Sequence, residues 1–420
     1  MTAVSARSEH SQAARACDLA VLVNEFPKLS ETFVVSDLLA LEARALRLRV
    51  FALRPPQSDL APQALRGLRA PVEYLPEIKG RQLQLLLRAT HLALLARAPT
   101  RYARGLAEIY ASPDFTRLRL QQAVLLARRL DQLGAPPLYI HFAHKPATVG
   151  RFASLLIGTP FAISSHAVDL WTSPSAELRA KFRDARVVLC CYREAHDFVS
   201  SLVDGATRVE LAPHGVTIPP EPIREEASPP VLLAVGRLIE KKGFDSLIRA
   251  AGILLSRAID FRLRIVGDGP LWSTLQRLVN ELELEEIVRF LGPLTEPELE
   301  QQYAQATVFV LPCLIAADGN RDGLPNTLLE AMARGLPVVS TTLASVREAV
   351  TDGEHGLLVS PGDTTALADA LGRLLDDAAL RRRLGSAARA RVADQYDRTA
   401  LAPRVFEALS RAGLIEWAAG

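Results

Sequence analysis

The chain has 420 residues, of which 49% are hydrophobic and 23% are charged, and its formal net charge is +2. These values exclude an intrinsically disordered chain, which needs low hydrophobicity and a high net charge. They also disfavour a nucleic-acid partner, because proteins that bind nucleic acids carry a clear basic excess. The length corresponds to two or three domains.

The four cysteines include no C-x-x-C pair, so the sequence predicts neither a disulfide framework nor a zinc site. Residues 1–17 lack the apolar stretch of a secretory signal and are expected to form a disordered tail. A membrane-spanning helix needs about 18 consecutive apolar residues, and no uncharged apolar run in the sequence is nearly that long. We therefore expect a cytoplasmic protein.

Short apolar runs alternate with helical stretches through residues 18–217, the first predicted domain. The predicted strands are 18–24, 48–53, 138–142, 160–164, 186–190 and 209–211, and a helix is predicted at 31–42. Their apolar residues are continuous rather than alternating. This pattern is typical of a parallel sheet covered by helices on both faces.

Residues 218–230 hold five prolines and are predicted to be the interdomain linker. The strand–helix alternation then resumes over residues 231–395, the second predicted domain. Residues 396–420 form a predicted C-terminal helix that packs back on the first domain. The predicted fold class is α/β, with two doubly wound Rossmann-like domains facing across a cleft at the carboxyl ends of their strands.

Residues 231–245 (VLLAVGRLIEKKGFD) place Arg237 and Lys242 directly after a buried strand. Gly236 and Gly243 permit tight turns there, and Gly236 is expected to border the ligand. Cations beside a helix N-terminus suit a diphosphate, because free amides and the helix dipole also attract an anion. A solvated charge cluster is the alternative.

Residues 318–337 (DGNRDGLPNTLLEAMARGLP) carry Asp322 in a loop and Glu330 eight positions later in a helix. We expect both carboxylates to point into the same cleft. Pro325 suits the first helical turn, and the amides of the three residues after it are free to face an anion. Capping acids on a surface helix are the alternative. The ligand-binding residues predicted beside the two acids are Gly323, Leu324, Pro325, Asn326, Thr327 and Leu328.

These motifs make the second half similar to the family 4 glycosyltransferases, which have the GT-B fold. The matching segments are GRLIEKKGFDSLI, LRIVGDGP, VRFLGPLTEPEL, DGLPNTLLEAMARGLPVVST and VREAVTDGEHGLLVSPGD, and they cover nearly all of 231–375. The family signature is a pair of acids with seven residues between them. Asp322 takes the first place, where Glu is usual, and Glu330 keeps the second.

The first half resembles the branch of this family that makes bacterial exopolysaccharides, including colanic-acid-type transferases. The matching segments are FPKLSETFVVSDLLAL, HFAHKPATVGRFASLL and SSHAVDLW. The family's Gly-Gly loop near the first strand is absent, and residues 27–31 stand in its place. Ser30 and Thr32 are expected to cap the next helix, and Ser30 and Glu31 are assigned to the substrate site.

His166 follows a predicted strand, three residues before Asp169. A histidine at this place can hydrogen-bond a sugar hydroxyl and be oriented by the acid. The family match assigns His166 to the transferred sugar and Asp169 to the substrate site, and a structural histidine is the alternative. His141 and His144 are weaker candidates, of which we expect one to be structural.

The resemblance implies a retaining transfer from a UDP-, GDP- or ADP-sugar to a hydroxyl of a lipid-linked or growing polysaccharide acceptor. Arg237 and Lys242 stabilise the leaving diphosphate, Asp322 contacts donor hydroxyls, Glu330 holds the ribose, and the backbone near Leu294 holds the base. No metal or other cofactor is expected, because protein cations take that role. The implied catalytic residues are His166, Arg237, Lys242 and Asp322.

Three other hypotheses stay open. A sugar-nucleotide 2-epimerase of the same fold needs no acceptor. A nicotinamide dehydrogenase would use the Gly267-x-Gly269 turn, but Pro270 follows it and Trp272 stands where the third glycine belongs. A catalytically silent scaffold is disfavoured by the cations and acids named above.

Residues 81–130 hold nine arginines and only two acidic residues, which the near-neutral total conceals. Leucine and alanine fill the rest of this stretch in helical patterns. Basic amphipathic helices bind anionic membranes, so we expect a peripheral protein on the inner face of the plasma membrane. A solvated arginine face is the alternative.

Overall fold

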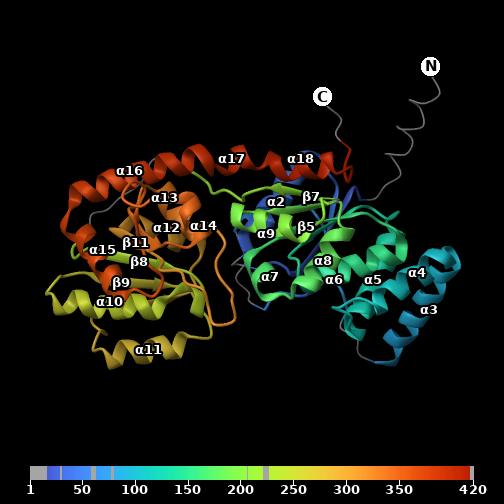
Figure 1. Cartoon of the computed structure of the whole chain (residues 1–420), viewed down its shortest axis with the longest axis horizontal. Coiled ribbons are helices and arrows are strands. Elements are labelled where there is room, and N and C mark those ends of the chain that lie inside the picture. Colours follow the sequence, from blue (N-terminus) through green and yellow to red (C-terminus); the bar gives the residue numbers. More distant parts are fainter. Residues whose placement is uncertain are drawn as a thin grey trace, which may run out of the picture. The chain divides into compact units, whose positions relative to one another are not determined.

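The computed structural model describes residues 17–28, 31–57, 63–76, 80–205, 207–220 and 227–416. Within these ranges the chain forms two compact units (Figure 1). The first contains the described residues of 1–190, 195–212 and 403–420, and the second contains 191–194 and the described residues of 213–402. Apart from the short segment 191–194, the chain changes unit after residues 212 and 402, whereas the sequence suggested boundaries after 217 and 395.

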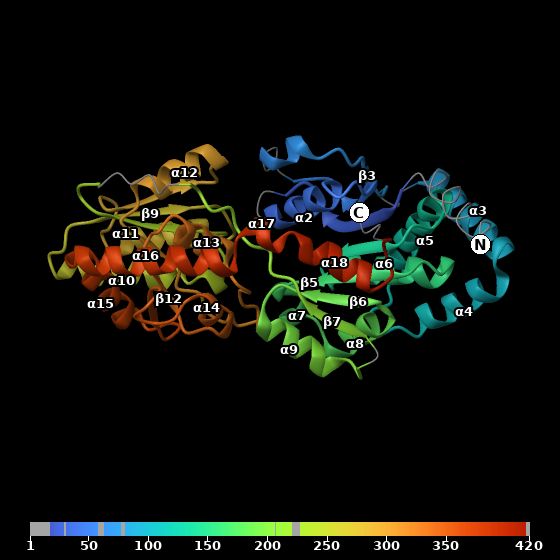
Figure 2. The ribbon, with the colours of Figure 1, turned by 90° about the horizontal axis from the view of Figure 1, so that it is seen from above.

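The first unit is built on a seven-stranded parallel sheet with the order β3-β2-β1-β4-β5-β6-β7. Figure 2 shows β5, β6 and β7 lying side by side. The strands are β1 (Leu19–Glu25), β2 (Leu48–Arg54), β3 (Val72–Tyr74), β4 (Leu138–His141), β5 (Phe161–Ser165), β6 (Val187–Cys190) and β7 (Arg208–Leu211). Each predicted strand is confirmed, whereas the edge strand β3 has no long apolar run that reveals it.

Helices cover this sheet and bury its apolar strands. They are α2 (Thr32–Glu42), α5 (Arg117–Gln132), α6 (Lys145–Ile157), α7 (Ala167–Thr172), α8 (Ser175–Asp184), α9 (Arg193–Leu202) and α18 (Pro403–Arg411). Val405, Phe406 and Leu409 of α18 are buried in the same core as Val34 and Leu38 of α2. The last described helix of the chain is therefore part of the first unit.

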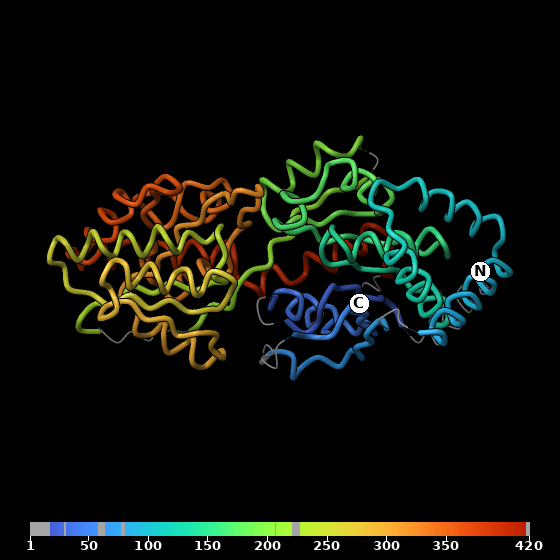
Figure 3. The backbone as a smooth tube through the Cα atoms, turned by 90° about the horizontal axis from the view of Figure 1, so that it is seen from below, coloured from blue at the N-terminus to red at the C-terminus, as the bar shows by residue number. Residues whose placement is uncertain are grey.

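Two further helices, α3 (Arg81–Arg97) and α4 (Pro99–Tyr110), lie at the outer edge of this unit (Figure 3). α4 packs on α6, and α3 packs on α4 and α5. Gly105 permits the close approach of α4 to α6, because a Cβ at this position would lie 2.5 Å from the carbonyl oxygen of Leu155.

A buried ion pair anchors the α4–α5 connection. Asp114 lies 3.3 Å from the ammonium nitrogen of Lys181, and both side chains are almost fully buried. Ser112 and Thr148 donate hydrogen bonds to the same carboxylate. Burial alone would raise the pKa of Asp114, but these hydroxyls and the charge of Lys181 lower it below its usual value.

Replacing Asp114 with alanine should destabilise the protein strongly, because it leaves the buried Lys181 ammonium with only the more distant carboxylate of Glu177, at 3.6 Å. We expect the free energy of unfolding to fall by about 3–5 kcal/mol, measured by urea unfolding. Asp197→Ala, at an acid whose side chain is 70% exposed, is the control and should change stability by less than about 0.5 kcal/mol. Equal stability of the two variants would contradict a structural role for the pair.

The second unit contains a six-stranded parallel sheet with the order β10-β9-β8-β11-β12-β13. Its strands are β8 (Val231–Val235), β9 (Arg262–Val266), β10 (Val288–Gly292), β11 (Val308–Val310), β12 (Val338–Thr341) and β13 (Leu357–Val359). β8 is buried throughout, as its continuous apolar sequence requires. Together the two parallel sheets confirm the predicted α/β class with two doubly wound domains.

The helices of the second unit alternate with its strands. They are α10 (Phe244–Ser256), α11 (Trp272–Glu281), α12 (Glu296–Gln305), α13 (Asn326–Ala333), α14 (Ala344–Ala349), α15 (Thr364–Asp376), α16 (Ala378–Gln395) and α17 (Arg398–Leu401). Local signals set several of their starts: at α12, for example, Thr295 and Glu298 form a capping box. Among the described residues, no helix has both the length and the apolar character needed to cross a membrane.

Candidate functional site

Glycines bring the carboxyl ends of β8 and β9 together, at the end of the second sheet where these strands terminate. The amide of Gly236 donates to the carbonyl oxygen of Val266 at 3.0 Å. Gly267 has φ +129°, and a Cβ there would lie 2.0 Å from the carbonyl oxygen of Gly236. A Cβ at Gly269 would lie 2.5 Å from the carbonyl oxygen of Leu238. Gly267 and Gly269 thus allow close backbone packing. They form a tight strand–helix turn, as the residues around them in the sequence indicate.

Two lysines share one carboxylate beside this turn. The short helix η3 (Glu240–Lys242) follows β8, and Asp322 lies in the loop between β11 and α13. The ammonium nitrogens of Lys241 and Lys242 lie 3.0 and 2.7 Å from the two carboxylate oxygens of Asp322. Each of the three side chains is only 10–13% exposed. The thiol of Cys313 donates to the same carboxylate at 3.2 Å.

Charge keeps this cluster ionised despite its burial. Burial favours the neutral acid, but the charges of Lys242 and Lys241 lower the pKa of Asp322 to about 2. Burial likewise opposes the charge of Lys242, and Asp322 more than compensates, so the pKa of Lys242 is raised. Two positive charges and one negative charge leave the cluster with a net positive charge.

The structure brings together two of the predicted site residues, Lys242 and Asp322, and adds Lys241. Both oxygens of Asp322 bind lysines, and its contact with the donor hydroxyls stays a prediction. The sequence offered one signal for Lys241, namely its place next to Lys242 in the same loop. Arg237 is exposed and, among the described residues, has no ion-pair partner.

The start of α13 is tied to the end of β8. The hydroxyl of Thr327 donates to the carbonyl oxygen of Val235 at 3.1 Å. Pro325 is the residue before the helix rather than its first residue. The amide of Leu328, predicted to be free, donates to the carbonyl oxygen of Pro325 at 3.1 Å. The amides of Asn326 and Thr327 have no acceptor among the described residues, so these two are available to an anion.

Packing explains the neighbouring loop residues. A Cβ at Gly323 would lie 2.7 Å from the ring of Tyr192, so only glycine fits. The hydroxyl of Ser345 donates to the carbonyl oxygen of Asp322 at 3.0 Å and holds this loop. Leu324, and Leu294 in the loop after β10, are partly buried against the core of the unit.

Glu330 has partners that differ from those of Asp322. Its Oε2 accepts a hydrogen bond of 3.0 Å from the phenol of Tyr303 in α12. The guanidinium of Arg334 lies 4.5 Å from the centre of the Tyr303 ring. Burial raises the pKa of Glu330. Asp322 and Glu330 thus belong to separate groups of side chains, and the expectation that both point into one cleft stays a prediction.

In the first unit, Asp169 binds backbone rather than the histidine ring. His166 directly follows β5 and precedes α7, and its amide donates to Asp169 at 3.1 Å. The amide of Ala143 donates to the same oxygen. Asp169 is fully buried, and burial raises its pKa to about 7. Its predicted contact with substrate is therefore replaced by a structural role at the start of α7.

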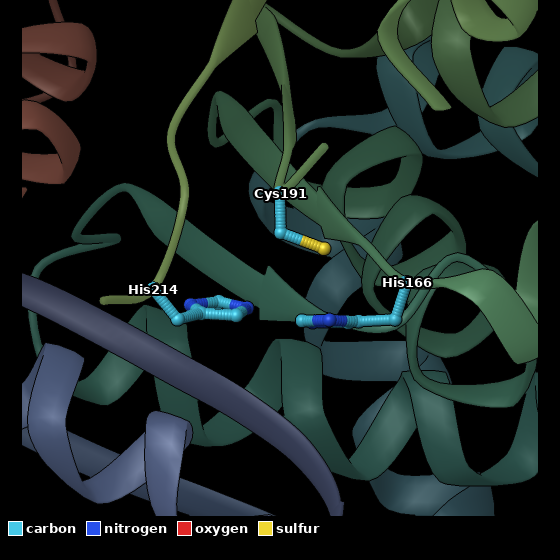
Figure 4. A group of neighbouring side chains, drawn as sticks. All are labelled: His166, Cys191 and His214. Carbon is cyan, nitrogen blue, oxygen red and sulfur yellow. The ribbon is translucent and has the colours of Figure 1, made fainter. Parts of the chain in front are cut away.

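The His166 ring lies among aromatic rings of the first unit. Its centre is 4.7 Å from that of Phe33 and 4.4 Å from that of Phe142. Figure 4 draws this side chain together with Cys191 and His214, which belong to the second unit. His141 is fully buried, and burial lowers the pKa of His144 to about 4. His144 is therefore poorly placed to carry charge at neutral pH.

The loop before α2 departs from the predicted capping. Ser30 lies outside the described residues. Glu31 is the residue before the helix and pairs with Lys28. Thr32 is already the first residue of α2, so it does not cap the helix.

Residues 229–377 match the family model described as glycosyl transferases group 1. The chain is 39% identical over 152 residues to the putative colanic acid biosynthesis glycosyltransferase WcaL of Escherichia coli, covering 36% of this chain and 37% of that protein. It is 28% identical over 362 residues to the Salmonella typhimurium protein of the same name, covering 82% and 87%. The chain thus spans about a third of one relative's length and most of the other's.

Solved structures extend the likeness to the whole fold. Anabaena Alr3699/HepE, crystallised in complex with UDP and glucose, superposes with a TM-score of 0.71 at 19% identity. The match covers 94% of this chain and 100% of that one.

Replacing Asp322 with asparagine should make Lys242 easier to deprotonate, because the lysine stays buried but loses the opposite charge. We expect the pKa of Lys242 to fall, so that it is acetylated at a lower pH than in the unchanged protein. Mass spectrometry after brief acetylation across a pH series measures this. Asp318→Asn, at an exposed acid nearby, should leave the profile unchanged. Identical profiles for all three proteins would refute the coupling.

Proposed function

Since this glycosyltransferase carries a group 1 domain at residues 229–377 and has the GT-B fold, we propose that it transfers a sugar from a nucleotide-diphosphate sugar with retention of configuration. The acceptor is a hydroxyl of a lipid-linked or growing polysaccharide. The names of the relatives support a role in exopolysaccharide synthesis: they are colanic acid enzymes and an amylovoran biosynthesis glycosyltransferase, AmsK, of Erwinia amylovora.

One observation carries the proposal: a positive cluster lies directly beside the start of a helix. Lys241 and Lys242 outnumber the single carboxylate between them, and the hydroxyl of Thr327 joins α13 to the end of the adjacent strand. Helix amides and nearby cations bind phosphates in the same way in many folds. We assign the donor diphosphate to this place, with Arg237 as the exposed cation that completes it.

The chemistry needs these charges at the leaving group. When the bond between the anomeric carbon and the diphosphate oxygen breaks, positive charge develops on the sugar and negative charge on the diphosphate. Lys242, Arg237 and the amides of Asn326 and Thr327 offset that negative charge without rearranging during the reaction. Because these groups supply positive charge themselves, we propose a reaction that needs no metal.

The remaining residues have assigned roles around the donor. Asp322 orients Lys242, and its Oδ1, which Lys241 contacts, has a further lone pair for a sugar hydroxyl. Oε1 of Glu330 takes a ribose hydroxyl, since Oε2 already binds Tyr303. The backbone near Leu294 takes the base, and His166 contacts the transferred sugar. A lipid-linked acceptor requires the enzyme to work at the inner face of the plasma membrane, and residues 81–130 are assigned to that surface.

A sugar nucleotide should stabilise the protein, because it binds the folded state alone. We expect thermal shift with UDP-, GDP- and ADP-sugars to select one base, with about 2.7 kcal/mol of stabilisation at a concentration 100 times the dissociation constant. NAD serves as the control and should have no effect. No shift with any sugar nucleotide at millimolar concentration would contradict the proposal.

Lys242→Ala should abolish most sugar transfer while leaving the protein folded. Loss of one preorganised contact to developing charge costs about 3–4 kcal/mol, or 10²–10³ in kcat. The measurement is transfer of radiolabelled sugar to membrane acceptor, with product analysis to distinguish transfer from epimerisation. Arg277→Ala, at an exposed cation of α11, is the matched control. Full activity of folded Lys242→Ala protein would refute the diphosphate assignment.

A further inference from the structure

Exposed apolar side chains gather in one part of the first unit. Among the described residues, eight large hydrophobic side chains are exposed, and five of them lie within residues 81–130. These five are Leu85, Leu92, Leu95, Tyr110 and Leu118, with exposed fractions of 63%, 67%, 40%, 61% and 56%. Single exposed leucines are ordinary, but a local concentration of them indicates an interaction surface.

Three of these leucines lie on one side of α3. Leu92 follows Leu85 by seven positions and Leu95 follows Leu92 by three, which places all three along one stripe of a helix. The opposite side of α3 is buried through Leu87 and Leu94 and packs on α4 and α5. Helix α3 therefore has two apolar sides: one is buried against the rest of the unit, and the other is the exposed stripe.

Two arginines belong to the same stripe. Arg81 precedes Leu85 by four positions and Arg88 precedes Leu92 by four, so each arginine lies one turn before a leucine. Both are exposed, and neither forms an ion pair among the described residues. Helix α3 contains no acidic residue, so nothing along its own length neutralises them.

Other arginines of this region stabilise the fold instead. Arg97 pairs with Asp131 at 2.9 Å, and Arg129 binds Glu73 at 2.6 Å. Arg101 donates to the carbonyl oxygen of Ile157 at 2.9 Å. The arginines of residues 81–130 thus fall into two groups. Some make contacts within the fold, and others have no ion-pair partner among the described residues. One side of α3 is the part of this surface where arginines without an ion pair among the described residues and exposed leucines share a single stripe.

We infer that the α3 face, formed by Arg81, Leu85, Arg88, Leu92 and Leu95, docks on an anionic lipid surface. The helix lies in the plane of the interface, with the leucines at the boundary between head groups and acyl chains and the guanidinium groups at lipid phosphates. Charge complementarity favours this occupant, because the face carries positive charge only.

A bilayer fits this face better than a protein partner does. One helix side of 17 residues is about 25 Å long. A stable protein interface buries about 800 Å² on each partner and usually includes aromatic anchors, whereas this face presents leucine and arginine. The inference rests on the proposed function only in that a lipid-linked acceptor gives docking a purpose, and docking is measured without any substrate.

Co-sedimentation of the full chain with vesicles tests the inference. Vesicles of phosphatidylcholine alone are compared with vesicles containing 30% phosphatidylglycerol, at 50 mM and 500 mM salt. We expect binding to the anionic vesicles that weakens strongly at high salt, since screening removes the arginine contribution. Arg81→Gln with Arg88→Gln should weaken binding about 25-fold, or about fivefold for each charge. Leu85→Gln with Leu92→Gln should weaken it at least about tenfold.

Matched controls lie on the second unit. Leu255→Gln replaces a leucine that is 43% exposed on α10, and Arg382→Gln replaces an exposed arginine of α16; both should bind vesicles as the unchanged protein does. Circular dichroism confirms that each variant is folded. Absence of binding to anionic vesicles, or equal binding by the α3 variants, would overturn the inference. So would leucine-dependent self-association without vesicle binding, which would assign the face to a second copy of the chain.

Donor binding separates this inference from the proposed function. The α3 variants should show the same thermal shift with a sugar nucleotide as the unchanged protein, because the diphosphate site belongs to the other unit. Vesicle binding without any donor shift would leave the docking face intact and overturn the proposed function. A donor shift without vesicle binding would support the proposed function and overturn the docking inference.

Discussion

One carboxylate shared by two lysines is the interaction on which the candidate site depends. Asp322 comes from the loop before α13, and Lys241 and Lys242 come from the turn after β8. At this depth a lone carboxylate would be neutralised and a lone ammonium would lose its proton. Each therefore keeps the other charged, and the surplus of one lysine gives this edge of the sheet a lasting positive charge beside two helix amides.

The backbone around the cluster is shaped to permit that meeting. Gly267 brings two strand ends closer than any side chain would allow, and Thr327 fixes α13 to the end of β8. Glycine-rich turns are usually associated with nucleotide binding. In this protein the glycines also allow the backbone to pack closely.

The arginines of the first unit show how one composition can serve two purposes. Some, such as Arg97 and Arg129, are held by acids of neighbouring elements and join helices together. Others, such as Arg81 and Arg88, alternate with exposed leucines on α3 and have no such partner among the described residues. Charge counted along the chain cannot distinguish them, because the difference lies in what packs beside each guanidinium group.

The sequence by itself determined the two parallel sheets, the turn that carries Lys242, the loop that carries Asp322 and the helix that follows it. These features depend on apolar runs and on glycine and proline at turns, which act between residues near one another in the chain. Only the tertiary structure decided that Asp322 binds two lysines, that Tyr303 occupies one oxygen of Glu330, and that Asp169 is used by the amide of Ala143. Those contacts join segments 26 to 81 positions apart. The packing of the helices and strands decides which polar groups meet across such separations.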